Sequence, residues 1–149
     1  MGDWVEGKFN GQGTYKFSDG GVYEGAFVDG NREGEGVMRY SNGDVYEGTF
    51  KEGNKEGKGV YKFADGGVYT GSYKKDLRHG YGTLTYSNGN IYKGQWENDK
   101  CWDFQCEYFV ASLKLMFKGE CFGQLSGGGY LGKYHATWVD GELVRDNAE

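Results

Sequence analysis

Aromatic residues and glycines recur along this chain at a constant interval, and they alternate with other residues in a way that predicts β-strands. Side chains at alternate positions of a strand point to the same face. In the stretch VYEGTF, Tyr46, Gly48 and Phe50 fall on one face, while a valine, a glutamate and a threonine fall on the other. The pattern returns every 23 residues, with one column of tyrosines and a second aromatic column four positions later. These columns are Tyr23, Tyr46, Tyr69 and Tyr92, then Phe27, Phe50, Tyr73 and Trp96.

A second strand is predicted in every repeat, because GKGVYKF alternates in the same way and puts Gly59, Tyr61 and Phe63 on one face. Turns such as KEGN separate the two strands, and SDGG, SNGD, ADGG and SNGN separate the repeats. Asp-Gly and Asn-Gly favour tight turns, which require positive φ. Each repeat is therefore expected to be a β-hairpin. Because a single hairpin is only marginally stable in water, we expect tandem antiparallel hairpins in an all-β, elongated, twisted solenoid or meander.

Glycines on the aromatic face have a predicted role in packing. Gly48 and Gly59 carry no side chain, so they leave space for aromatic rings to lie across the backbone. The aromatic columns are accordingly expected to build most of the core. Any aromatic surface left exposed would form a groove for an apolar or helical segment of a protein partner. The candidates for this contact are Phe27, Phe50, Tyr73, Trp96, Tyr23, Tyr46, Tyr69 and Tyr92.

A basic column gives a second candidate surface. Arg32, Lys55 and Arg78 recur at the 23-residue interval and would form a basic row along one edge of a solenoid. Such a row could bind acidic lipid head groups or an acidic partner segment. The alternative is an ordinary solvated turn surface, because Glu33 and Glu56 adjoin the column. The net charge of −5 argues against general binding of nucleic acid.

The repeated segments YEGAFVDGNREGEG and YEGTFKEGNKEGKG resemble the MORN (membrane occupation and recognition nexus) repeat. The resemblance implies a solenoid of hairpins and a non-enzymatic role in scaffolding, protein–protein contact or attachment near membranes, often in cytoskeletal assemblies. It therefore implies a cytoplasmic protein associated with the cytoskeleton or a membrane. Some family members carry the repeats as an accessory part of an enzyme, so an accessory region of a larger enzyme is a further alternative.

The repeat weakens toward the C-terminus. Residues 1–102 are expected to hold the repeats, beginning with a partial unit, and 103–149 an atypical cap, because Asp103 and Gln105 replace the expected glycines. The run YFVASLKLMF at 108–117 fits either a strand or a helix. The segment 134–143, YHATWVDGEL, realigns with the repeat and predicts a last, degenerate hairpin. Self-association through the end hairpins is a further prediction.

No catalytic residue, metal ligand or cofactor stands out. Cys101, Cys106 and Cys121 are odd in number and form no CxxC pair, which favours a reduced chain over a disulfide framework or a zinc site. The run GGGYLGK has the spacing of a phosphate-binding loop, but Tyr134 replaces the required Ser or Thr. His79 falls in a turn column and is expected at the surface.

Overall fold

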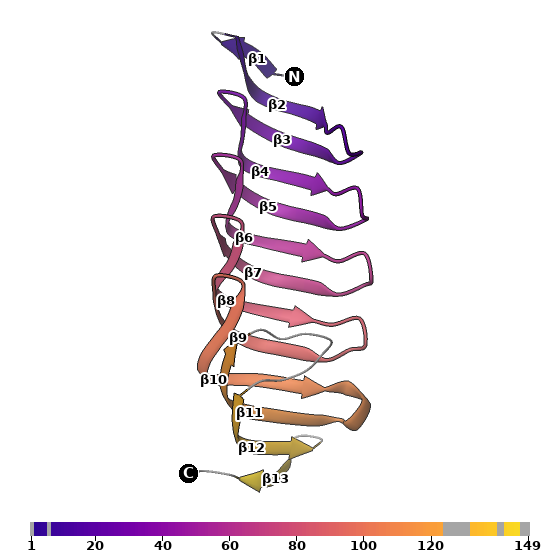
Figure 1. Cartoon of the computed structure of the whole chain (residues 1–149), viewed down its shortest axis with the longest axis vertical. Helices are drawn as coiled ribbons and strands as arrows, with labels where there is room; N and C mark the ends of the chain where they lie inside the picture. Colours follow the sequence, from indigo (N-terminus) through magenta and orange to yellow (C-terminus); the bar gives the residue numbers. More distant parts are fainter. Residues whose placement is uncertain (1, 6, 124–131, 140–141, 147–149) are drawn as a thin grey trace.

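The strands form one antiparallel sheet in which every strand is hydrogen-bonded to its neighbours in the sequence. The computed structural model describes residues 2–5, 7–123, 132–139 and 142–146. The sheet is a long stack with the two chain ends at opposite ends (Figure 1). Its elements are β1 Gly2–Val5, β2 Lys8–Lys16, β3 Val22–Val28, β4 Asn31–Arg39, β5 Val45–Lys51, β6 Asn54–Lys62, β7 Val68–Lys74, β8 Leu77–Thr85, β9 Ile91–Glu97, β10 Lys100–Val110, η1 Ala111–Leu113, β11 Leu115–Gly123, β12 Gly132–Val139 and β13 Glu142–Asp146.

This architecture confirms the predicted all-β fold of tandem hairpins. In the part of the chain that the structure describes, no helix has the length and apolar character needed to cross a membrane. Two kinds of turn alternate along the stack. The turn inside a repeat has two residues with positive φ, for example Lys75 at 50° and Asp76 at 70°. This is the arrangement that matches the twist of a tight hairpin. Between repeats, the N–H of Gly43 donates to the carbonyl of Tyr40 at 3.0 Å, and Gly43 has φ of 97°.

A tyrosine ring covers a pair of facing glycines in each repeat. Gly48 of β5 lies opposite Gly59 of β6, and Tyr46 is fully buried beside them. A Cβ atom added to Gly59 would lie 2.4 Å from the Tyr46 ring, which is closer than real Cβ contacts. The Tyr46 hydroxyl donates to the Thr49 carbonyl at 3.0 Å, so the ring is held over the glycines. The predicted role of Gly48 and Gly59 is therefore confirmed.

The buried rings contact one another edge to face from β2 to β9. Tyr46 lies 5.1 Å from Phe50 of its own repeat and 5.3 Å from Tyr73 of the next, measured between ring centroids. The same alternation links Tyr23 to Phe50 and Tyr69 to Trp96. Each such pair contributes about 0.5–1.5 kcal/mol beyond the burial of area. We call this set the aromatic ladder: Phe27, Tyr23, Phe50, Tyr46, Tyr73, Tyr69, Trp96 and Tyr92. The sheet face that carries it is the inner face.

The C-terminal part departs from one expectation. The run 108–117 is neither one strand nor a helix: β10 ends at Val110, η1 makes the turn, and Lys114 has φ of 51° before β11 begins. The N–H of Ala111 donates to Asn90 Oδ1 at 3.0 Å, which fixes this segment as a turn between hairpins. Apolar residues on both sides of the turn concealed it in the sequence.

The sheet also continues through the proposed boundary at residue 102, which lies within β10. The pairing of β10 with β9 loses its register between Cys101 and Glu107, where Asp103 and Gln105 stand in place of glycines. Farther on, β12 pairs with β13 in the segment for which a last hairpin was predicted.

We predict that Gly59→Ala lowers the free energy of unfolding by about 1–3 kcal/mol, because the new methyl group overpacks against the Tyr46 ring. Chemical denaturation monitored by circular dichroism measures this change. The control is Lys58→Ala, which alters an exposed neighbour on the opposite face and should change stability by less than about 0.5 kcal/mol. Equal effects of the two substitutions would contradict the packing role of Gly59.

We also predict that the protein loses stability as the pH rises above about 10. Burial raises the pKa of Tyr46, Tyr69, Tyr73 and Tyr86 above the ordinary tyrosine value of 10.0. The folded state then holds protons that the unfolded state releases, so this stabilisation is complete below pH 10 and declines as the pH rises toward the folded pKa values. Thermal unfolding across the alkaline range measures it. Unfolding temperatures that do not fall above pH 10 would contradict the prediction.

Candidate functional site

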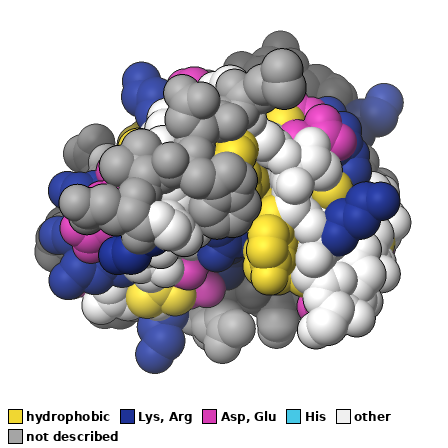
Figure 2. Space-filling model, turned by 90° about the horizontal axis from the view of Figure 1, so that it is seen from above, with side chains coloured by type: hydrophobic (Ala, Val, Ile, Leu, Met, Phe, Trp, Pro, Cys, Tyr) yellow, Lys and Arg dark blue, Asp and Glu magenta, His cyan; other side chains and the backbone are white. Residues whose placement is uncertain are grey.

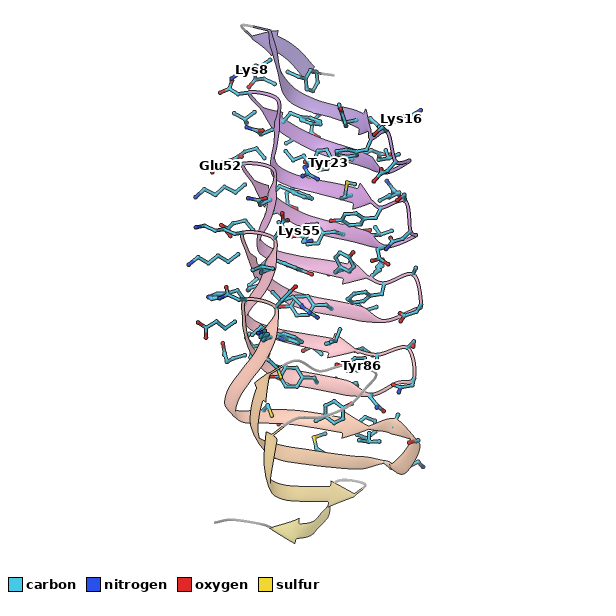
Figure 3. All side chains as sticks on the ribbon, in the orientation of Figure 1. Lys8, Lys16, Tyr23, Glu52, Lys55 and Tyr86 are labelled. Carbon is cyan, nitrogen blue, oxygen red and sulfur yellow. The ribbon has the colours of Figure 1, made fainter. Side chains whose placement is uncertain are left out.

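The inner face carries most of the candidate residues, because both the aromatic columns and the basic column lie on it. Figure 3 shows Tyr23 and Lys55 over the middle of the sheet. Lys8 and Glu52 lie at the edge of the turns within repeats, and Lys16 and Tyr86 lie toward the edge of the turns between repeats (Figure 3). We call the inner face between these two edges of turns the trough.

The eight aromatic residues proposed to line an open groove are buried. No surface is exposed on Tyr23, Tyr46, Tyr69 or Tyr92, and Phe27, the most exposed of the eight, is 8% exposed. Edge-to-face packing uses the edges and faces of these rings inside the sheet. The expectation of a core is thus confirmed, whereas the expectation that these side chains leave an open aromatic groove is wrong. Their contact with a partner stays a prediction, and their burial counts against it.

The basic column also turns inward. Lys55 Nζ lies 5.2 Å from the ring centroids of Tyr61 and Tyr73 and 5.8 Å from those of Tyr40 and Tyr46. Its side chain is only 14% exposed. Burial lowers the pKa of Lys55 below its usual value, while Asp76 opposes this effect. The lysine stem crosses the trough, so Lys55 covers the ladder instead of forming an exposed basic edge.

Arg32 and Arg78 occupy the equivalent places. The guanidinium carbon of Arg78 lies 4.5 Å from the ring centroid of Trp96, and that of Arg32 lies 5.3 Å from the ring centroid of Phe50. A cation over an aromatic ring is attracted by about 0.5–2 kcal/mol, depending on how far it is desolvated. The basic row that was predicted along one edge thus has its charged groups over the rings of the inner face, and binding of acidic lipids by this column stays a prediction.

Two of these cations hold the next repeat by ion pairs. Lys55 Nζ lies 3.9 Å from Asp76 Oδ1, and Arg78 Nε lies 2.9 Å from Asp99 Oδ1. Both carboxylates also accept a backbone N–H from the cationic residue itself. Arg32 instead donates from Nη2 to the carbonyl of Gly53 at 2.5 Å. The column therefore joins consecutive repeats. Lys55 and Arg78 do so through a carboxylate, whereas Arg32 does so through a backbone carbonyl.

A pocket of about 290 Å³ lies on the inner face beside Arg32. We call it the Arg32 pocket, and its lining consists of aromatic rings, the guanidinium and turn backbone: Tyr15, Phe17, Tyr23, Phe27, Gly30, Asn31, Arg32 and Gly53. Tyr15 is 54% exposed, unlike the rings of the ladder. Seen from the N-terminal end of the stack, hydrophobic side chains reach the surface near the middle, and most charged side chains lie farther out (Figure 2). The structure thus opens the trough near its first full repeat.

The opposite, outer face carries a smaller apolar cleft near the C-terminal end. Its volume is about 270 Å³, and Ile91, Phe109 and Met116 line it together with Lys93 and Glu107. The two charged residues lie directly opposite each other on β9 and β10. This cleft therefore offers apolar contact but no unbalanced charge.

Sequence reasoning missed two buried polar residues that tie repeats together. Asp44 accepts a hydrogen bond from the Tyr61 hydroxyl and another from the Ala64 N–H, both at 2.7 Å. Burial alone would raise the pKa of Asp44, but these bonds and one from Asn42 together lower it. Asn90 has the same place two repeats later. The signal was a column in which glycine alternates with a residue whose side chain accepts hydrogen bonds: Gly21, Asp44, Gly67 and Asn90.

His79 is half-buried, which corrects the expectation of a surface turn residue. Glu33 and Glu56 occupy its column in the two preceding repeats, and each accepts a backbone N–H from the turn of the repeat that follows it. Nδ1 of His79 is shielded from solvent, and no described residue bonds to it. The column is therefore a contact between repeats and not a free surface.

The cysteines are not all reduced in the structure. Cys106 is disulfide-bonded, which corrects the expectation for that residue. Cys101 is buried and is not in a disulfide, and burial raises the pKa of its thiol to about 11. Within the described ranges, no three side chains of His, Cys, Asp or Glu gather as metal ligands would. The GGGYLGK run lies mostly outside the described residues.

Comparison with known proteins agrees with this geometry. The MORN repeat profile matches five consecutive segments: residues 1–22, 23–45, 46–68, 69–91 and 92–102. No curated protein matches the chain. MORN repeats are found in repeat proteins that interact with membranes or proteins, and the family is generally non-catalytic. The matched segments cover residues 1–102 of the 149, and with the hairpin stack described above they show that this chain belongs to the MORN repeat family.

Proposed function

We propose that this protein is a non-catalytic scaffold that binds a segment of a protein partner in the Arg32 pocket. The observation that carries this proposal is the difference between Tyr15 and the ladder: Tyr15 is 54% exposed, whereas the ladder rings are at most 8% exposed. Tyrosine and arginine are frequent anchors of protein interfaces. A partner side chain placed here would gain aromatic contact without displacing the core.

The size and shape of the pocket favour a peptide over a small metabolite. Pockets for small molecules span about 300–1,000 Å³ and enclose most of the ligand. The Arg32 pocket, at about 290 Å³, lies just below that range and opens to the surface of the trough. It has room for one or two side chains of an extended segment. The rest of that segment would run along the trough, over Lys55 and the rings that surround it.

Attachment to an acidic membrane surface is supported less well. That interpretation needs Arg32, Lys55 and Arg78 at an exposed edge, but their charged groups lie over rings inside the trough. A flat lipid surface reaches recessed charges poorly, whereas an extended chain can enter between the two edges. No observation on the described residues favours an accessory role in a larger enzyme over a scaffold.

Site-specific crosslinking tests the proposal. A photoreactive amino acid replaces Tyr15 in one variant and Tyr81 in another, in cells that make the full chain. Tyr81 is a matched control, because it is 57% exposed but pairs with Gln95 on the outer face. We expect a crosslinked protein partner from position 15 and not from position 81. Equal crosslinking from both positions, or none from position 15, would overturn the proposal.

A further inference from the structure

The turn inside each repeat supplies a carboxylate to the cation of the preceding repeat, except at Arg32. Asp76 pairs with Lys55 and Asp99 pairs with Arg78, at 3.9 Å and 2.9 Å. At the matching position one repeat earlier, 23 residues before Asp76, stands Gly53. Arg32 therefore faces a turn that has no acidic side chain at this position. The other residue of that turn, Glu52, is exposed and forms no ion pair with Arg32.

The missing carboxylate results from the side chain and not from a different turn. Gly53 has φ of 85°, close to the 70° of Asp76 and the 71° of Asp99. The N–H of Gly53 donates to the Arg32 carbonyl at 3.0 Å. Asp76 and Asp99 make the equivalent bonds to their cationic residues at the same distance. The backbone frame for a carboxylate is thus in place beside Arg32, and only the acidic group is absent.

The guanidinium of Arg32 is left with unused capacity. Its bond to oxygen is the one to the Gly53 carbonyl, and its Nη1 makes a long contact of 3.9 Å to the Met38 sulfur. Across the described residues, no carboxylate oxygen lies within 4 Å of it. Three rings, those of Phe17, Tyr23 and Phe50, lie within 6 Å and partly shield it from water. A partly desolvated cation gains most from an ionised partner that accepts hydrogen bonds.

We propose that an Asp or Glu side chain of the partner segment enters the Arg32 pocket and pairs with Arg32. It would take the place that the carboxylates of Asp76 and Asp99 occupy beside Lys55 and Arg78. This inference rests on the proposed function and names its chemistry. An apolar or aromatic residue next to that acidic residue packs on Tyr15 and Phe17. The two internal examples are carboxylates, and a single guanidinium among rings balances one negative charge. A phosphate group would bring nearly two.

The repeat itself supplies the sharpest variant for a test. Gly53→Asp gives Arg32 the internal carboxylate that the next two cations already have, on a backbone that accepts Asp at φ near 70°. We expect this variant to fold, to unfold at a higher temperature, and to bind acidic peptides about 10- to 100-fold more weakly, since Arg32 is already paired. Arg32→Gln should weaken the same binding to a similar degree.

The probe is a library of synthetic peptides in which Asp or Glu adjoins an aromatic or branched apolar residue. A matched library carries Asn or Gln instead. Affinities for the full chain are measured in solution, with Thr70→Asp as the control. That substitution adds the same charge at an exposed position of β7 on the outer face, and it should leave binding unchanged. Circular dichroism confirms that each variant is folded.

Several outcomes would overturn the inference. Acidic and amide peptides that bind equally would exclude pairing with Arg32. Acidic peptides could also bind Gly53→Asp and Arg32→Gln with full affinity while crosslinking through position 15 persists. This result would refute the pairing of a partner carboxylate with Arg32 but would be consistent with the scaffold function. Tighter binding of phosphoserine peptides, or binding of phosphatidylserine vesicles that Arg32→Gln abolishes, would identify a different anion. Absence of crosslinking from position 15 in a chain that keeps Gly53 and Arg32 would refute the scaffold function itself.

Discussion

The close packing of a tyrosine ring over facing glycines is the constraint on which the rest of this structure depends. The glycines face each other in an unbroken row across the sheet, from Gly13 through Gly94. A Cβ atom on Gly48 would lie 2.7 Å from the Gly59 Cα, so the strands approach too closely there for any other residue. Each tyrosine fills the space and turns its edge to the aromatic residue of the next repeat. Where Asp103 and Gln105 replace glycines, the pairing of β10 with β9 loses its register.

The ladder determines where the charges go. Once the rings are packed edge to face, a cation on the adjacent strand can still lie over them. Lys55 does so within 6 Å of four rings, and its carboxylate partner comes from the next repeat. An ion pair with one partly exposed member contributes little alone. Repeated at each junction, it adds to the nearest-neighbour contacts that hold a repeat stack together.

Much of this fold could be predicted because its period is in the sequence. The Asp-Gly and Asn-Gly pairs predict the tight turns and thus the hairpins. The spacing of glycines and aromatic residues predicts which face of the sheet is packed. The fate of the aromatic surface could not be predicted, because contacts such as Tyr23 with Phe50 join neighbouring repeats and depend on the twist of the sheet. Lys55 itself lies four positions before Gly59 on β6, so alternation alone places it on the face of that glycine. What the sequence does not show is the register of β5 with β6, which shifts between Gly48 and Phe50 and sets Lys55 opposite Phe50.

A regular repeat of this kind leaves little of its inner face for a ligand, because it satisfies its own rings and charges. Function must then come from positions where one repeat differs from the others. Near the N-terminal end, Tyr15 has exposed surface that the equivalent Met38 lacks, and Gly53 withholds the carboxylate that Asp76 and Asp99 provide. Tyr15 and Gly53 both line the Arg32 pocket. The Arg32 pocket therefore combines exposed aromatic surface with a cation that has no carboxylate partner, whereas in the outer cleft at Ile91 the charges of Lys93 and Glu107 face each other. In the function that we propose, the repeats build the trough, and the exceptions to the repeat give one end of it its selectivity.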